Sequence, residues 1–363
     1  MFAERVKCDT IASEEQQKEL SSVVNALQGV SAPARLPGVI DTLSTGYRTL
    51  NRHLYLLLVP IVLDVFYWLG PRLSVGPVAR QIVQTLEQMR TSPTLGVTTP
   101  QTTQSFETVK TMVENMGETV NLFSMLSSPL SIPSVLVSRD LKAPSWLGGG
   151  MVVTVATPAQ FLGAFVLLFV LGAIVGAVYL GLVAQVVRDG RGHLIAAIRR
   201  AGLYASRYIV LVVGLLMAAI MMGLPLALLI GLITLLSPLL GTLLMVVMWA
   251  GLLWLYLYAF FTIDALFVSD ARPLMAILKS ITVVRLSTSS AMGFLLAIVV
   301  ISLGMPYVWS ALGGSEIATL VSILGNAYIG TGLTVASMIF YRDRIRLIVS
   351  NQMTIQRRED SAL

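Results

Sequence analysis

The sequence contains very few of the side chains from which catalytic and metal sites are built. In 363 residues there is one cysteine, Cys8, and there are two histidines, His53 and His193. A single cysteine excludes a disulfide framework within the chain. Neither histidine has cysteines or an acidic cluster beside it at the spacing of metal ligands. The sequence therefore predicts no metal, no cofactor and no enzyme activity.

Charge is scarce as well. Asp, Glu, Lys and Arg make up 12% of the chain, whereas a globular protein carries about 25%. Hydrophobic residues make up 55%, and the mean hydropathy is +0.79. This balance is typical of a chain buried in lipid. The net charge of +6 indicates no nucleic-acid partner, because basic residues beside membrane segments face anionic lipid headgroups.

Long apolar runs dominate the sequence instead. A bilayer core of about 30 Å is crossed by about 20 apolar residues in a helix, and several runs reach or approach that length. The fold class that follows is all-α, a polytopic membrane bundle of about six transmembrane helices. The predicted spans are residues 54–69, 161–187, 208–236, 239–267, 291–312 and 317–341.

These spans give the chain its domains and its orientation. Between residues 71 and 158 there are six Lys and Arg, and the other 19 fall on the opposite side. By the positive-inside rule, both termini are therefore cytoplasmic. The predicted regions are a cytoplasmic leader (1–53), a first transmembrane helix (54–70), an extracytoplasmic helical insertion (71–157), a five-helix transmembrane block with amphipathic cytoplasmic connectors (158–341) and a basic cytoplasmic tail (342–363).

Local patterns add detail outside the spans. The polar first 45 residues contain no cleavable signal, so the first span is expected to act as an uncleaved anchor in a bacterial plasma membrane. A capping box at Ser13 predicts a short helix over 14–27. In the insertion, apolar residues at helical spacing predict helices over 78–89 and 106–126.

Three polar residues inside the predicted spans are candidates for function. Asp64 lies one turn after Pro60, and a carboxylate in hydrocarbon normally turns toward protein, water or a partner charge. It would bind an ion or carry a proton, or pair structurally with Arg72 or with a carbonyl freed near Pro60. Asp264 lies near the cytoplasmic interface, where a helix end or an arginine suffices. Asn326 is expected to make an interhelical hydrogen bond worth about 1 kcal/mol.

Other residues are expected to contact lipid or neighbouring helices. Gly172 and Gly176 form a small-xxx-small pair, which lets another helix backbone approach closely. Basic residues on the cytoplasmic side can reach lipid phosphates. The candidate headgroup contacts are Arg199, Arg200, Arg207, Lys279, Arg285, Arg342, Arg344 and Arg346.

A faint internal repeat links two of the cytoplasmic connectors. Asp189-Gly190-Arg191-Gly192 and Asp270-Ala271-Arg272-Pro273 lie about 80 residues apart. Each follows a span and precedes a basic amphipathic stretch and another span. The two units run in the same direction, so the pattern indicates a parallel repeat and not the inverted repeat of many transporters.

The second connector carries a resemblance to a known family. Residues 264–273 and the stretch Ala276-Ile277-Leu278-Lys279-Ser280 are similar to the connector of bacterial membrane proteins grouped with the membrane domain of glycerophosphoryl diester phosphodiesterases. The resemblance covers the C-terminal half of the chain and implies a membrane fold. In those enzymes catalysis belongs to a separate soluble barrel, which this chain lacks, so no activity is implied.

Three classes of function remain to be compared. A non-enzymatic scaffold or accessory subunit of a membrane complex needs only packing surfaces, which the sequence has in abundance. A permease needs a polar pathway, for which the candidates are few unless the substrate is hydrophobic or lipid-like. A membrane enzyme needs paired acids, a Ser/His pair or a metal site. The sequence favours the first, with anionic lipids and membrane proteins as partners.

Overall fold

The fold was described from a computed structural model, which covers residues 37–91, 100–136 and 151–360. These residues are almost entirely helical, which confirms the predicted fold class. The predicted leader helix at 14–27 and Cys8 lie outside the described residues. The described residues form two compact units, unit 1 (37–56, 180–301 and 332–360) and unit 2 (57–91, 100–136, 151–179 and 302–331).

Five helices are long and apolar enough to cross a membrane, and a sixth span follows if the bent stretch around His53 counts as one. His53 separates an amphipathic helix, α2 (Val39–Arg52), from the first predicted span, which the structure divides into η1 (Leu54–Leu57) and α3 (Leu58–Leu69). The five are Pro158–Asp189, Leu194–Leu236, Pro238–Val268, Thr288–Ala311 and Glu316–Ser350. The chain is therefore compatible with a multi-pass membrane protein.

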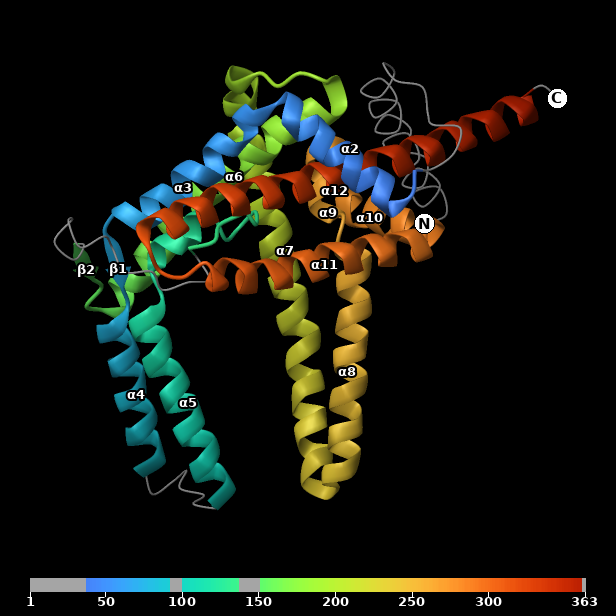
Figure 1. Cartoon of the computed structure of the whole chain (residues 1–363). Helices are drawn as coiled ribbons and strands as arrows, with labels where there is room; N and C mark the ends of the chain where they lie inside the picture. The colour runs from blue at the N-terminus through green and yellow to red at the C-terminus, as the bar shows by residue number, and fades with distance from the viewer. Residues whose placement is uncertain (1–36, 92–99, 137–150, 361–363) are drawn as a thin grey trace. The chain divides into compact units, whose positions relative to one another are not determined.

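Unit 2 contains the helical insertion that the sequence predicts. Helices α4 and α5 lie side by side as a hairpin (Figure 1), and Gly117 on α5 lies against Ala79 on α4. Lys110 donates to Glu87 across the hairpin at 2.7 Å, and this hydrogen bond raises the pKa of Lys110 above its usual value. The unit contains α3 (Leu58–Leu69), β1 (Arg72–Ser74), α4 (Gly76–Thr91), α5 (Pro100–Thr119), η2 (Leu122–Leu126), β2 (Val152–Thr154) and parts of α6, α11 and α12.

Two short strands in unit 2 were not predicted. Strands β1 and β2 pair in parallel, with Leu73 opposite Val153. Asn121 lies beside them, where its side-chain oxygen accepts from the backbone N–H groups of Leu73 and Phe123. Helix α5 ends at Thr119, and Leu122–Leu126 form the 3-10 helix η2 instead. The α-helix predicted over 106–126 therefore ends earlier than expected.

Unit 1 is built from the helical segments at the other ends of α6, α11 and α12, together with α2 and α7 to α10. A hairpin of α7 and α8, turning at Ser237, is its longest feature (Figure 1). The elements are α2 (Val39–Arg52), η1 (Leu54–Leu57), α6 (Pro158–Asp189), α7 (Leu194–Leu236), α8 (Pro238–Ala259), α9 (Thr262–Val268), α10 (Pro273–Leu286), α11 (Thr288–Ala311) and α12 (Glu316–Asp360).

Two boundaries in unit 1 differ from the prediction. The amphipathic connector at 193–207 and the span after it form one continuous helix, α7. Likewise, α12 continues without a break through Arg342 to Asp360, so the basic tail extends the last span and is not a separate element. A change from apolar to basic residues does not end a helix, because Arg, Leu and Ala all have high helix propensity.

Close helix packing in unit 1 depends on small residues. A Cβ added at Gly46 of α2 would lie 2.7 Å from the Ala336 Cβ of α12 and 2.9 Å from its Cα. A Cβ added at Gly332 of α12 would lie 2.1 Å from the Tyr47 ring of α2. Beside this contact, the rings of Phe261, Phe294 and Phe340 stack. These contacts hold α2, α9, α11 and α12 together.

Candidate functional site

Asp64 is fully buried in unit 2, where its carboxylate accepts two hydrogen bonds. The Ser134 hydroxyl donates one, and the Val135 backbone N–H donates the other at 3.1 Å. Trp68, one turn further along α3, packs with Val135 and Trp309 in the hydrophobic core of the unit. The carboxylate therefore ties the segment at 132–136 to α3.

These contacts favour the structural interpretation of Asp64 over the ion or proton site. The partners that the sequence suggested were Arg72 and a carbonyl near Pro60, whereas the donors that the structure shows are Ser134 and Val135. A buried carboxylate that accepts hydrogen bonds from a hydroxyl and a backbone N–H has its desolvation partly offset. Nothing in the sequence around Ser134 marked it as this partner.

Asp264 lies deeper in the protein than the sequence indicated. It is 6% exposed on α9, and the Ser337 hydroxyl of α12 donates to its carboxylate at 2.5 Å. One turn further along α12, the Tyr341 hydroxyl lies 2.8 Å from that of Ser269. Asp264 lies in the first turn of α9, at a helix end, and its donor is the Ser337 hydroxyl and not an arginine. The two hydroxyl contacts join α9 to α12.

Ser280, the last residue of the stretch that carries the family resemblance, has a structural role. The helix is interrupted between α8 and α9 at Phe260 and Phe261. A backbone N–H and a backbone carbonyl at this interruption therefore have no hydrogen-bond partner within a helix. The Ser280 hydroxyl accepts from the Phe261 N–H at 3.1 Å and donates to the Tyr258 carbonyl at 2.6 Å. This serine therefore satisfies both groups at the break.

Asn326 is half-buried on α12. Among the described residues, no hydrogen bond from its side chain to another helix is present, so the predicted interhelical bond is not found there. Its neighbour Gly325 instead makes the close contact, since a Cβ on Gly325 would lie 2.4 Å from the Trp309 ring of α11. Packing, and not a polar bond, brings these two helices together in unit 2.

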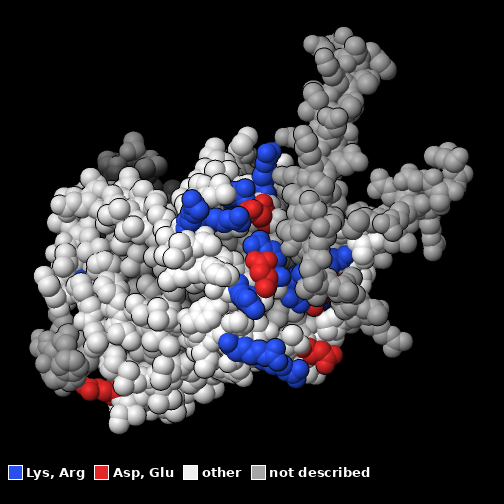
Figure 2. Space-filling view, turned by 90° about the horizontal axis from the view of Figure 1, so that it is seen from above, with Lys and Arg blue, Asp and Glu red and all other residues white. Residues whose placement is uncertain are grey.

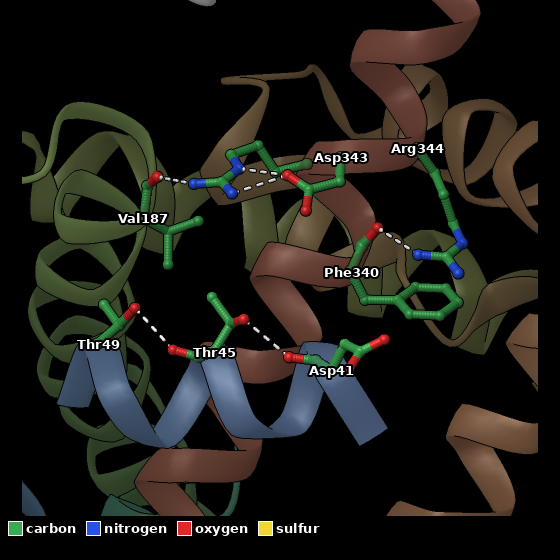
Figure 3. A network of polar contacts seen from close by, with 8 residues as sticks. Asp41, Thr45, Thr49, Val187, Phe340, Asp343 and Arg344 are labelled. Atoms are coloured by element: carbon green, nitrogen blue, oxygen red, sulfur yellow. Dashed lines mark hydrogen bonds and ion pairs between the residues drawn. The ribbon is translucent and has the colours of Figure 1, made fainter. Parts of the chain in front are cut away.

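The predicted headgroup contacts fall into two groups. Arg344 and Arg346 are only 2% and 6% exposed, and Arg344 stacks on Phe340 with its guanidinium carbon 3.2 Å from the ring centroid (Figure 3). Buried guanidinium groups are out of reach of lipid phosphates, so the structure corrects the prediction for these two. The remaining candidates, of which Arg199, Arg200 and Arg285 are exposed and Lys279 and Arg342 half-buried, stay predictions.

Arg207 has a partner in the protein. Its guanidinium lies 2.5 Å from the Asp270 carboxylate and donates to the Asp270 carbonyl at 3.0 Å. Asp270 has a positive φ of 50°, a conformation that Asp tolerates better than most residues. The ion pair therefore fixes the turn between α9 and α10 to α7, and a headgroup would have to compete with Asp270 for Arg207.

The predicted packing glycines lie against the loop after α5. A Cβ at Gly172 would lie 2.3 Å from the Met125 carbonyl oxygen, and one at Gly176 would lie 2.6 Å from the Leu130 side chain. The neighbour that approaches α6 is therefore a 3-10 turn and the residues after it, and not another long helix. Both contacts lie within unit 2.

The α7–α8 hairpin, in contrast to the packed glycines of α6, presents an exposed apolar surface. Along it, large apolar side chains are exposed on both helices, with Met222 of α7 at 76% and Leu239 of α8 at 71%. A Cβ added at Gly214, Gly223 or Gly231 of α7 would meet no atom of the chain within 4 Å. Where Gly241 meets Thr234, close to the turn, the two helices do pack tightly.

A polar cavity lies in unit 1 where α2 and α6 end. It has a volume of about 420 Å³ and is half-open, and its lining comes from α2, α6 and α12. Figure 2 shows Lys and Arg side chains lying beside Asp and Glu side chains on one face of the molecule. The cavity is lined by Thr49, Arg52, His53, Val186, Val187, Arg188, Asp189, Gly190, Ile339 and Arg342.

Neither a metal site among the described residues nor a match to a known protein indicates the function of this chain. Within residues 37–91, 100–136 and 151–360, no three His, Cys, Asp or Glu side chains come together as a metal site would require. Comparison with protein families, curated proteins and solved structures finds no match. The resemblance to the phosphodiesterase membrane domain stays a prediction, and the function must be inferred from the surfaces described above.

Proposed function

We propose that this chain is a non-enzymatic integral membrane protein that acts as a scaffold or accessory subunit of a membrane complex. The observation that carries the proposal is the α7–α8 hairpin, whose large apolar side chains are exposed on both helices. In a bilayer this hairpin offers its surface to lipid or to the helices of another protein.

The glycines of α7 favour a protein over lipid as the neighbour of the hairpin. A glycine inside a helix destabilises that helix by about 1 kcal/mol relative to alanine. In membrane proteins such a glycine usually allows a second helix to approach closely. Among the residues that the structure describes, none approaches Gly223 or Gly231 in this way. A helix from another subunit would supply the missing neighbour, whereas lipid tails gain nothing from these glycines.

The polar groups support a role without chemistry. Asp64 and Asp264, the carboxylates in the predicted spans, are engaged by Ser134, Val135 and Ser337, and these contacts hold the protein's own segments together. The proposal also retains the cytoplasmic termini, on the distribution of Lys and Arg, and the bacterial plasma membrane, on the absence of organelle-type targeting in the sequence.

The test is purification of the full chain in nanodiscs without denaturation, followed by mass spectrometry. We expect a stoichiometric protein partner with the unmodified chain, and its loss in Gly223→Leu and Gly231→Leu, which fill the open positions on α7. Val166→Leu is the control, because Val166 is exposed on α6, outside the hairpin, and the substitution fills no open glycine.

The opposite results would overturn the proposal. A chain that purifies alone has no accessory role under these conditions. Recovery of the partner with all three variants would show that the hairpin is not its binding surface. A lone chain that retains a specific lipid would instead favour the alternative, a permease for a hydrophobic or lipid-like substrate.

A further inference from the structure

We infer that the cavity at the ends of α2 and α6 binds a phosphate-bearing anion, either the headgroup of an anionic phospholipid or a soluble phosphate. Three arginines line it, Arg52, Arg188 and Arg342, with two acids beside them: Asp189 in the lining and Asp343, which is paired with Arg342. Guanidinium groups match the oxygens of phosphate in geometry and charge. This site is independent of the hairpin surface.

Arg342 is held in place for such a role. Its Nε and one terminal nitrogen contact the Asp343 carboxylate at 2.8 and 2.7 Å, an ion pair that neutralises its charge in part, and the other terminal nitrogen donates to the Val187 carbonyl at 2.7 Å (Figure 3). An arginine has further N–H groups on both terminal nitrogens, so these contacts fix the guanidinium plane without exhausting its donors. A preorganised group loses less conformational entropy when a ligand binds.

Arg52 and Arg188 complete the positive surface. Arg188 makes paired hydrogen bonds with Asp189 at 3.0 and 3.1 Å, which neutralise its charge in part. Arg52 lies exposed in the last turn of α2, and no ion pair to it is present among the described residues. No acid in the described part of the chain therefore offsets the charge of Arg52 at the edge of the cavity, and an anion is attracted there.

The end of α6 does not cancel this charge. The C-terminal end of a helix is negative because its last carbonyl groups have no donors. Here the Val187 carbonyl accepts from Arg342, and the Val186 carbonyl accepts from the Gly190 N–H at 3.0 Å. These carbonyls are already satisfied and oppose an anion less than free ones would.

Two arginines of the cavity follow the apolar parts of helices, where the phosphates of a membrane would lie. Arg188 follows the apolar part of α6, and Arg342 follows that of α12 after Tyr341. Basic residues at the ends of apolar spans lie at the level of the headgroups. Val186, Val187 and Ile339 give the cavity an apolar wall, which suits the glycerol end of a lipid.

The test is isothermal titration of the full chain in detergent with dioctanoyl phosphatidylglycerol, inorganic phosphate and dioctanoylglycerol. We expect the phosphate-bearing lipid to bind and the phosphate-free diacylglycerol not to bind. Competition by inorganic phosphate would identify a soluble phosphate as a ligand, and its failure to compete would identify the headgroup.

Variants locate the binding. Arg52→Gln should weaken it about tenfold, the loss of one charge-assisted contact, and its exposure keeps the fold intact. Arg342→Gln should weaken it further, although the loss of the Val187 contact would also loosen α6. The control is Arg285→Gln, an exposed arginine that does not line the cavity. Absence of binding to the unmodified chain, or equal affinity of Arg52→Gln, Arg285→Gln and the unmodified chain, would overturn the inference.

Discussion

The α7–α8 hairpin and α12 differ in a way that reverses a common expectation. The most apolar windows of α7 and of Pro238–Val268 have mean hydropathies of 2.6 and 2.0, yet only 6% of each is buried. The corresponding window of α12 has a mean hydropathy of 1.4, and 61% of it is buried. In water the more apolar helix would lie inside. In lipid, hydropathy reports exposure to the bilayer, and small or polar residues mark the buried interfaces.

Glycine gives the same comparison at single positions. On α12, a Cβ at Gly325, Gly330 or Gly332 would lie 2.1 to 2.4 Å from the nearest side chain. On α7, a Cβ at Gly214 or Gly223 would meet nothing within 4 Å. The first group serves packing inside the chain, and we interpret the second as serving packing with another protein.

Filling a buried glycine should have the largest effect. Gly46→Leu places a side chain against the Ala336 backbone and should lower the free energy of unfolding by at least about 3 kcal/mol. Gly223→Leu on the open hairpin should change it by less than about 0.5 kcal/mol. Thermal unfolding in detergent measures both, and similar losses for the two variants would break the comparison.

Removing the buried carboxylate of the first span should come next. Asp64→Ala leaves the Val135 N–H without its acceptor and should destabilise unit 2 by about 2–3 kcal/mol. Asp64→Asn keeps one acceptor oxygen and should lose less. Hydrogen exchange at Val135 should rise with the same order of effect, and unchanged stability in both variants would return Asp64 to the list of functional candidates.

The break between α8 and α9 offers a smaller effect at the base of the hairpin. Ser280→Ala leaves the Phe261 N–H and the Tyr258 carbonyl without their partner, for an expected loss of about 1–2 kcal/mol. Thr282→Ala on the same helix is the control, because its hydroxyl bonds only the Leu278 carbonyl at an exposed site. A loss in the control as large as in Ser280→Ala would contradict this role.

The smallest effect is expected at the ion pair between α7 and the turn before α10. Arg207→Gln removes the contact with Asp270, and because both side chains are partly exposed the loss should be about 0–1 kcal/mol. High salt should reduce the difference between the variant and the unmodified chain. A difference that does not respond to salt would indicate that Arg207 acts through packing instead.

Much of the fold could be predicted because long apolar runs and amphipathic stripes are local signals. The hairpin of α4 and α5 followed from such stripes. The strands β1 and β2 could not be predicted, since three residues each are too few to show a period. The sequence does not predict that the connector at 193–207 continues into the span after it, because a change in polarity resembles a helix end, although backbone hydrogen bonds do not depend on side-chain polarity.

The sequence predicts which residues belong to the candidate site, but it does not predict which residues they contact. The cost of a carboxylate in hydrocarbon singled out Asp64 and Asp264, and the structure buries both. Ser134 lies 70 positions from Asp64 in the sequence, and Ser337 lies 73 positions from Asp264. Such pairings depend on tertiary structure, as does the burial of Arg344, whose basic setting resembles that of an exposed interfacial residue.

The most direct test of the central claim is photo-crosslinking in native membranes from single positions on the two helices. A photoreactive residue replacing Met222, which is exposed on α7, should give one discrete intermolecular product whose protein also co-purifies stoichiometrically. The same residue replacing Met338, which is fully buried on α12, should react only within the chain. Products with lipid alone from position 222 would contradict the account.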